Sequence, residues 1–168
     1  YLLPIEHPDW FAAAFPASAH EGSTSYLVVD AKGVSPDLAM RYDVALIDVA
    51  WSVPLDADGD GRLTWREIGE NRPAIAGWLR EGLHFARSSQ PCALDIGEPW
   101  LTERLGLPYL SFDMAATCPR AGPVEIASSL FFDSDAYHRV LVSVATPRAV
   151  HAATLAPVSL RHLAASLR

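Results

Sequence analysis

Basic charge, cysteine and long apolar runs are all scarce in this sequence. The chain of 168 residues carries 13 Lys and Arg against 20 Asp and Glu, a formal net charge of −7. It therefore lacks the basic face that binding to nucleic-acid phosphates requires. No apolar run approaches the ~20 residues needed to cross a bilayer. Half of the residues are hydrophobic, which is ordinary for a folded domain with its own core. We therefore expect neither a nucleic-acid partner nor a membrane span within this chain.

The two cysteines, Cys92 and Cys118, leave two alternatives open. In an oxidising compartment they could pair, close a loop and stabilise the fold by roughly 3 kcal/mol. In the cytosol they would be two reduced, buried thiols. Two cysteines without neighbouring histidines do not predict a zinc site.

Signatures of catalysis are also missing. The sequence has no G-x-S-x-G elbow, no Gly-rich phosphate loop and no H-E-x-x-H pattern, so we expect a protein that is not an enzyme. One alternative is a secreted, calcium-stabilised hydrolase whose site is assembled from distant residues. Another is a calcium-dependent carbohydrate- or protein-binding module with an exposed aromatic platform, which would use Trp51, Trp65 or Trp100.

Short alternating hydrophobic segments dominate the chain and predict strands. Residues 23–33 and 37–48 form one predicted hairpin. After Pro91 six further segments are separated by Pro, Gly or Asp. This pattern predicts a mainly β fold, namely an antiparallel, immunoglobulin-like β-sandwich, and we expect residues 20–168 to form one such domain. The six segments are CALDI, YLSFDMAATC, VEIASSLFFD, HRVLVSVAT, RAVHAATLAP and VSLRHLAASL.

A helical pattern interrupts the strands over residues 64–86. Its apolar residues recur on one side of a helix, and Pro73 predicts two helical pieces, the second starting near it. Just before, the segment VALIDVAWSVPL predicts a strand followed by at most a short turn of helix, because Pro54 would disturb a longer one. The apolar residues of the predicted helix pair are Ile68, Ile75, Trp78, Leu79, Leu83 and Phe85.

Between these regions lies LDADGDGRLTWREI, residues 55–68, in which acidic residues alternate. The stretch matches D-x-[DN]-x-[DN]-G-x5-E, the EF-hand loop, at every specified position. Calcium takes six to eight hard oxygen ligands, and this spacing supplies three single carboxylate oxygens, a backbone carbonyl, a hydroxyl or bridging water, and a closing bidentate carboxylate. The predicted ligands of calcium are, in that order, Asp56, Asp58, Asp60, Arg62, Thr64 and Glu67.

Other residues of the loop predict its role. Gly61 permits the sharp turn, and Leu63 ties the loop to the core. No second acidic loop and no long entering helix accompany it, whereas a paired calcium sensor needs both. The sequence therefore predicts a structural calcium site rather than a switch. Magnesium fits less well, because it prefers octahedral geometry and keeps its waters.

A second cluster, formed by Asp133, Asp135 and His138, has two interpretations. Two carboxylates and an imidazole could bind a second metal ion. Alternatively, the segment is a hairpin turn whose aspartates accept hydrogen bonds from backbone amides. We favour the turn.

The first residues of the chain also have two interpretations. Residues 1–19 are either an N-terminal arm or the remnant of a signal segment, since Ala17–Ala19 is an A-x-A pattern. If cleavage followed Ala19, the amine and imidazole of His20 would chelate copper or nickel.

The ordered set of these features resembles a known family. AHEGSTSYL, RYDVALIDVAWSVPLDADGDGRLTWREI, the two cysteines with Pro119, and LFFDSDAYHRVLVSV are similar to segments in the extracytoplasmic N-terminal portion of HupE/UreJ-like bacterial membrane proteins. The resemblance extends from His20 to about Val144.

The resemblance carries several expectations. In that family a similar domain follows a signal peptide and precedes a multi-helix membrane domain with proposed roles in nickel or cobalt uptake. It implies an extracytoplasmic location, periplasmic or secreted, with tethering through a C-terminal region. The implied partners are a metal ion and the membrane domain of the same full-length protein, to which any transport would belong. It also favours cleavage before His20 and a Cys92–Cys118 disulfide.

Overall fold

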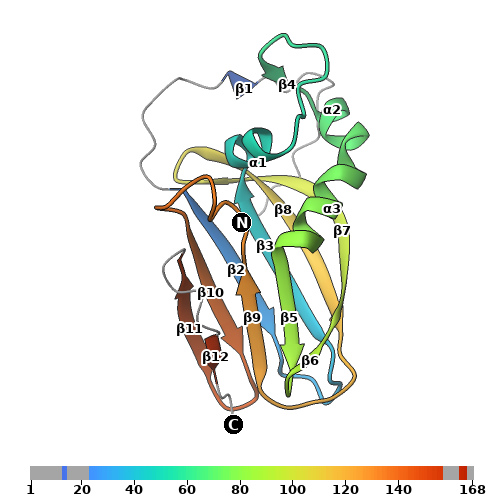
Figure 1. Ribbon diagram of the computed structural model, residues 1–168, viewed down its shortest axis with the longest axis vertical. Coiled ribbons are helices and arrows are strands. Elements are labelled where there is room, and N and C mark those ends of the chain that lie inside the picture. Colours follow the sequence, from blue (N-terminus) through green and yellow to red (C-terminus); the bar gives the residue numbers. More distant parts are fainter. Residues whose placement is uncertain (1–12, 15–22, 157–162, 166–168) are drawn as a thin grey trace.

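Strands predominate over helices in the computed structural model, which describes residues 13–14, 23–156 and 163–165 (Figure 1). The predictions made for the A-x-A pattern and for His20 lie outside these residues. Among the described residues, none of the helices combines the length and apolar content that a membrane crossing requires.

The strands form two main sheets and one small one. Six strands follow the order β11-β10-β2-β3-β8-β7, four follow the order β12-β9-β5-β6, and β1 pairs with β4. The six-stranded sheet comprises β2 (Thr24–Asp30), β3 (Leu38–Ala45), β7 (Ala93–Arg104), β8 (Leu107–Thr117), β10 (Arg139–Ala145) and β11 (Val150–Leu155). The four-stranded sheet comprises β5 (Leu83–Arg87), β6 (Gln90–Pro91), β9 (Val124–Ser128) and β12 (Leu163–Ala165). The small pair is β1 (Ala13–Ala14) and β4 (Arg62–Leu63).

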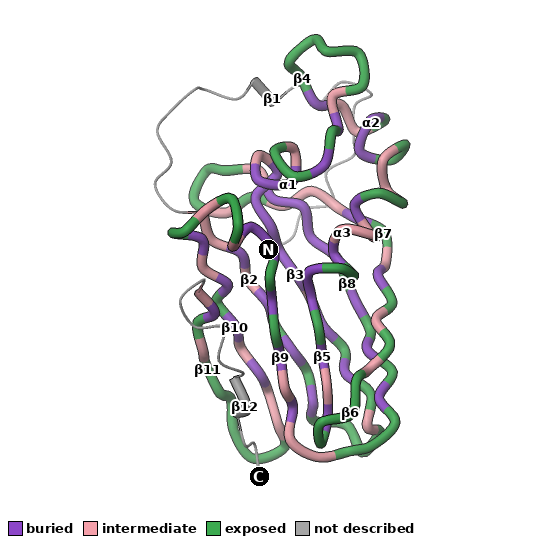
Figure 2. Tube along the Cα trace, in the orientation of Figure 1, coloured by how far each residue is buried: buried purple, intermediate pink, exposed green. Residues whose placement is uncertain are grey.

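The two main sheets pack face to face, and their facing side chains make the core. Buried residues alternate along the strands of both sheets (Figure 2). Tyr42 of β3 and Phe112 of β8 are the largest fully buried side chains. Met40 and Met114 are direct cross-strand partners in the same core. The predicted mainly β sandwich is thus confirmed.

One strand pairing differs from a purely antiparallel sheet. β10 runs parallel to β2 along its whole length, from Arg139↔Thr24 to Ala145↔Asp30, so the six-stranded sheet is mixed. Alternation gives the same hydrophobic pattern for either direction, and the direction of this pairing could not be predicted from it.

The β7 strand is longer than the predicted CALDI segment, because a β-bulge allows the strand to continue through Gly97 and Pro99. The register shifts between Ile96 and Pro99, and the bulge accommodates a residue that has no N–H for the ladder. A Cβ on Gly97 would lie 2.8 Å from the carbonyl oxygen of Asp113. This glycine allows the close approach of the two backbones.

The described residues form three helices, and these lie at one end of the sandwich (Figure 1). The predicted pair is present, and Pro73 lies in the first turn of the second helix. Two details were wrong. The helix before the loop spans seven residues and ends at Ser52, where the extended Val53 precedes Pro54. Leu83 and Phe85 lie on β5, because their alternation buries both against the core. The helices are α1 (Leu46–Ser52), α2 (Trp65–Glu70) and α3 (Arg72–Gly82).

The disulfide Cys92–Cys118 joins the start of β7 to the end of β8, with Cα atoms 4.3 Å apart. The adjacent residues Ala93 and Thr117 are cross-strand partners, so the bridge closes the open end of this hairpin. The two cysteines are 26 residues apart in sequence. Bridging them restricts the unfolded chain and thereby stabilises the folded state by about 3 kcal/mol. The two-thiol alternative is not what the structure contains.

Candidate metal site

The acidic loop projects from the end of the sandwich between α1 and α2, and buried side chains fix both of its ends. Leu55 before the first aspartate and Leu63 before Thr64 are each 1% exposed. Ile68 on α2 is fully buried. All three belong to the hydrophobic core, whereas most of the residues between the leucines are exposed (Figure 2).

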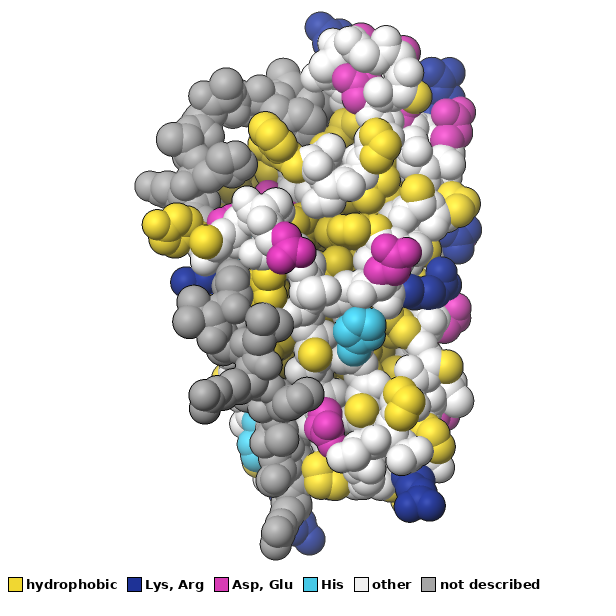
Figure 3. Space-filling view, viewed as in Figure 1, with side chains coloured by type: hydrophobic (Ala, Val, Ile, Leu, Met, Phe, Trp, Pro, Cys, Tyr) yellow, Lys and Arg dark blue, Asp and Glu magenta, His cyan; other side chains and the backbone are white. Residues whose placement is uncertain are grey.

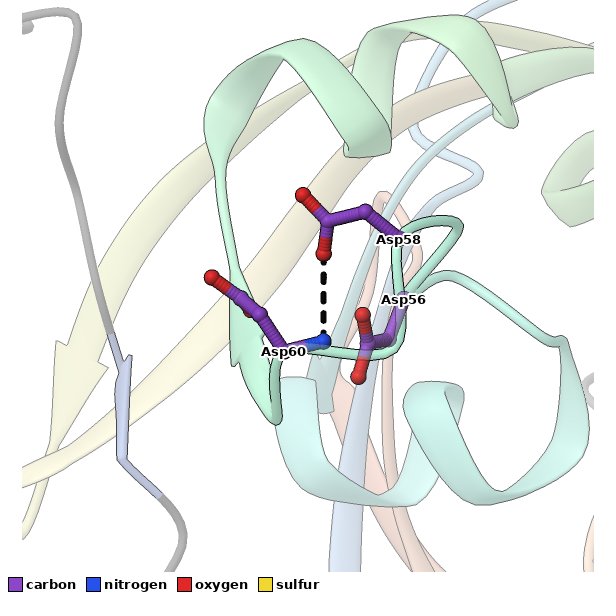
Figure 4. A group of neighbouring side chains, drawn as sticks. All are labelled: Asp56, Asp58 and Asp60. Atoms are coloured by element: carbon purple, nitrogen blue, oxygen red, sulfur yellow. Dashed lines mark hydrogen bonds between the residues drawn. The ribbon is translucent and has the colours of Figure 1, made fainter.

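Asp56, Asp58 and Asp60 converge in this loop (Figure 4). A carboxylate oxygen of each lies within 4.8 Å of those of the other two. The backbone N–H of Asp60 donates to Oδ1 of Asp58 at 3.1 Å, which holds the loop in its curl. Acidic side chains are visible on the surface at this end of the molecule (Figure 3). Three carboxylates this close repel one another unless a cation neutralises them.

Two glycines make the curl possible. Gly59 and Gly61 have φ values of 74° and 76°, in the left-handed region that glycine adopts without steric cost. Their N–H groups donate to Oδ1 and Oδ2 of Asp56 at 2.8 and 2.9 Å. The sequence prediction identified Gly61 but not Gly59, although the Asp-Gly repeat was a signal for it.

Glu67 is held beneath the loop by a capping box at the start of α2. The N–H and hydroxyl of Thr64 donate to Oε2 of Glu67 at 2.9 and 2.8 Å, and the N–H of Glu67 donates back to the hydroxyl at 3.3 Å. The N–H of Ala57 donates to Oε1 at 3.1 Å. These hydrogen bonds, first those from Thr64, hold the pKa of the buried Glu67 carboxyl below its usual range, against the nearby charge of Asp56.

The backbone of Arg62 connects the aspartates to the small sheet. Its N–H donates to Oδ1 of Asp60 at 2.7 Å, and its side chain is exposed. On β4 it pairs with Ala14, and Leu63 pairs with Ala13. Nothing in the sequence predicted that β1 would supply this partner.

The structure therefore brings three of the six predicted ligands together, and the carboxylate of Glu67 is not part of that group. The gathered donors are hard carboxylate oxygens, which suit a cation such as Ca²⁺. Glu67 lies at the correct loop position, but its oxygens are engaged by Thr64 and Ala57. It would have to turn from these partners to grip an ion with both oxygens.

The second cluster lies in a turn, but the predicted hairpin was wrong, because β9 and β10 on either side of it belong to different sheets. Of the two aspartates, Asp135 is the one for which the described residues show backbone N–H donors. The N–H of Tyr137 donates to Oδ1 of Asp135 at 2.8 Å, while Asp133 is exposed. His138 is fully buried against Phe131, with ring centroids 4.4 Å apart. Its two ring nitrogens contact serine hydroxyls, Nδ1 that of Ser23 at 2.5 Å and Nε2 that of Ser25 at 3.1 Å. Among the described residues, Asp133, Asp135 and His138 do not gather their ligand atoms as the loop aspartates do.

The burial of His138 predicts a loss of stability in mild acid. Burial lowers the pKa of His138 to about 4, opposed by Asp135 and assisted by Arg139. In the unfolded chain the imidazole of His138 takes up its proton near pH 6.5. Between pH 6.5 and pH 4 the unfolded chain therefore binds more protons than the folded chain, so the free energy of unfolding falls as the pH falls through that window. We expect a total loss of about 3 kcal/mol, of which about 2 kcal/mol is lost between pH 7 and pH 5. Urea unfolding at the two pH values measures it.

A matched variant isolates this effect. His138→Gln, which cannot take up a proton, should remove most of the difference between pH 7 and pH 5, whereas His84→Gln at an exposed position should leave it unchanged. An undiminished loss in His138→Gln would contradict the assignment.

The hydrolase alternative requires a cavity with a carboxylate pair or a His–Asp pair. Two surface cavities of the described residues have no Asp or Glu in their walls. Ser25 and His138 are both fully buried. The carboxylate of Asp135 accepts a hydrogen bond from the hydroxyl of Ser23 at 3.1 Å. One of the two cavities is lined by Arg80, Leu83, His84, Phe85, Pro91, Cys92 and Leu94.

The aromatic residues considered for a binding platform lie on different elements. Trp51 lies on α1 and is 74% exposed. Trp65 begins α2 and packs against the core. Trp100 lies on β7 beneath the guanidinium of Arg41, 5.2 Å from the ring centroid, so that the cation covers one face of the ring.

No protein-family model matches the chain, and the search of curated proteins finds no significant match. The structure itself therefore defines the class of protein: a disulfide-bonded, mainly β sandwich with a loop of three clustered aspartates at one end. The resemblance to HupE/UreJ-like proteins stays a prediction.

Proposed function

We propose that this chain is a calcium-binding, non-catalytic extracytoplasmic module in which one calcium ion stabilises the end of the sandwich. The observation that carries the proposal is the convergence of Asp56, Asp58 and Asp60, with carboxylate oxygens within 4.8 Å. Calcium, with its tolerance of six to eight oxygen ligands, suits this flexible set better than octahedral magnesium. Arg62 supplies its carbonyl, Thr64 its hydroxyl or a bridging water, and Glu67 the closing bidentate carboxylate.

The buried surroundings of the loop support a structural rather than a switching role. A sensor opens its helices on binding and exposes an apolar groove. Here α2 and α3 contribute Ile68, Ile75 and Leu79 to the core, all 0% exposed. Opening these helices would expose their apolar side chains to water, at a free-energy cost of about 25 cal/mol per Å² of exposed area. This cost disfavours a switch.

The disulfide supports the extracytoplasmic part of the proposal. Disulfides persist in oxidising compartments and are rare in the cytosol, and Cys92 and Cys118 are bridged. With the resemblance of the sequence, this favours a HupE/UreJ-like membrane protein as the parent, a membrane domain of the same protein as partner, and an accessory role in nickel or cobalt uptake.

Calcium titration of an Asp58→Asn variant tests the site. The amide oxygen of asparagine can still accept the N–H of Asp60, so the loop should keep its curl while losing one ligand charge. Since hydrogen bonds and contacts of charged groups are worth ~1.5–3 kcal/mol, we expect calcium affinity to fall by roughly tenfold or more, measured by isothermal titration calorimetry.

The unchanged protein should bind one calcium ion. The matched control is Asp95→Asn, at an exposed position on β7 far from the loop in sequence, which should bind as the unchanged protein does. Equal weakening in both variants would show a general charge effect, and no heat of binding in the unchanged protein would refute the proposal.

A further inference from the structure

A small cavity lies at the end of the sandwich opposite the acidic loop, where β2, β5 and β10 end (Figure 1). Its volume is about 130 Å³, and it opens to solvent on one side. Two of its lining side chains are cationic and none is acidic. The lining residues are Ala31, Arg87, Gly122, Val124, Thr146, Pro147 and Arg148.

Arg87 places a fixed positive charge in this cavity. Its side chain is 9% exposed. The guanidinium donates from Nε to the carbonyl of Gly122 at 3.0 Å and from Nη1 to the carbonyl of Pro36 at 2.7 Å. These neutral partners hold the guanidinium but do not balance its charge. No carboxylate of the described residues forms an ion pair with it. A buried cation without a counter-charge is costly, and an anion would relieve that cost.

Arg148 adds a second positive charge from the turn between β10 and β11. The turn is closed by the N–H and hydroxyl of Thr146, which donate to the carbonyl of Ala149 at 2.8 and 3.0 Å. Arg148 itself is exposed, so it is available to a ligand entering from solvent.

The carboxylates next to the cavity in sequence are engaged elsewhere. Asp30, which precedes Ala31, pairs with Lys32 at 3.7 Å. Glu125, which follows Val124, accepts the N–H and hydroxyl of Ser89 at 3.0 and 3.1 Å. The cavity therefore carries two positive charges on a chain whose net charge is −7.

We propose that this cavity binds a single small oxyanion group, a carboxylate or a phosphate, between Arg87 and Arg148. A guanidinium presents donors in a fork that matches the oxygens of both groups. The free donors of Arg87 bind the group inside the cavity, and Arg148 closes over it from the rim. This site is independent of the calcium loop, which lies at the other end of the sandwich.

Titration of the full chain with inorganic phosphate and with acetate tests the proposal and distinguishes the two anions. Chemical shifts of backbone amides are followed at constant ionic strength, with chloride as the balancing anion, because screening weakens such contacts. Shifts should saturate at Gly122, Thr146 and Arg148 for at least one of the two anions. Arg148→Ala, a change at an exposed turn position, should weaken that binding about tenfold.

The control is Arg120→Ala, which removes the same charge from an exposed position outside the cavity wall and should bind as the unchanged protein does. Arg87→Lys keeps the charge but not the fork and should also bind more weakly. Shifts no larger than those caused by chloride would overturn the proposal. So would equal weakening in Arg120→Ala and Arg148→Ala.

Discussion

Replacement of Asp43 by alanine is expected to lower the free energy of unfolding by about 3–5 kcal/mol. Its neighbours Tyr42 and Val44 face the core, so Asp43 points to the opposite face of the six-stranded sheet, where its side chain is nonetheless only 2% exposed. Arg41 donates from Nε to Oδ1 at 2.8 Å, and Arg104 donates from Nε to Oδ2 at 3.0 Å. Removing the carboxylate leaves two half-buried guanidiniums close together without a counter-charge.

The aromatic rings beneath the arginines explain why these cations cannot simply swing into water without loss. Arg104 lies 4.1 Å from the ring centroid of Tyr26, and Arg41 lies 5.2 Å from that of Trp100. Such cation–π contacts are worth about 0.5–2 kcal/mol each and would be lost with the swing.

Urea unfolding at pH 7 measures the effect of Asp43→Ala. Asp95→Ala, at an exposed position on the same sheet, controls for the loss of one acidic charge and should change stability by less than about 0.5 kcal/mol. If Asp43→Ala costs no more than Asp95→Ala, the ion cluster does not stabilise the sheet.

Saturation with calcium is expected to raise the free energy of unfolding by about 4 kcal/mol when free calcium is a thousandfold above the dissociation constant. In the proposed function the ion binds the folded loop and has no preformed site in the unfolded chain, so binding would add to stability by mass action. For a chain of this size the midpoint of thermal unfolding should rise by about 10 °C. With its affinity reduced about tenfold, Asp58→Asn should lose about 1.4 kcal/mol of that gain at the same free calcium, roughly a third of the rise. Thermal melts with calcium and with a chelator measure it, and identical melts would argue against a stabilising ion.

The strand pattern and the acidic loop could be predicted because both are local in sequence. Alternation at Leu38, Met40 and Tyr42 marks a buried strand face wherever the strand pairs. The spacing of the loop aspartates fixes which carboxylates meet, because a short curled backbone leaves few alternatives. The same locality explains the correct start of the second helix near Pro73.

Features that depend on distant partners could not be predicted. The parallel pairing of β10 with β2 joins segments 115 residues apart, as in Val140↔Ser25, and alternation carries no information on direction. The boundary between α3 and β5 was missed because Leu83 continues the helical spacing of Leu79 while also starting a strand. The charge cluster around Asp43 joins β3 to β7 through Arg104, and neither segment alone indicates it.

Within the candidate site, the sequence predicted the positions but not the hydrogen bonds. Glu67 was expected as a bidentate ligand, and in the structure its oxygens accept from Thr64 and Ala57. The capping pattern T-x-x-E was present in the sequence, but it coincides with the closing positions of the loop. Thr64 and Glu67 therefore form the capping box of helix α2 in the structure, and the same two residues are ligands of the ion in the proposal.

Amide hydrogen exchange with and without calcium tests the central claim most directly, because it locates the effect of the ion along the chain. A structural ion should increase protection in the loop from Asp56 to Glu67 and in helices α2 and α3, with little change in the strands of the two main sheets. Unchanged exchange in the loop at saturating calcium would contradict calcium binding there. Reduced protection of α2 and α3, with increased binding of a hydrophobic dye, would contradict a structural role and indicate a switch.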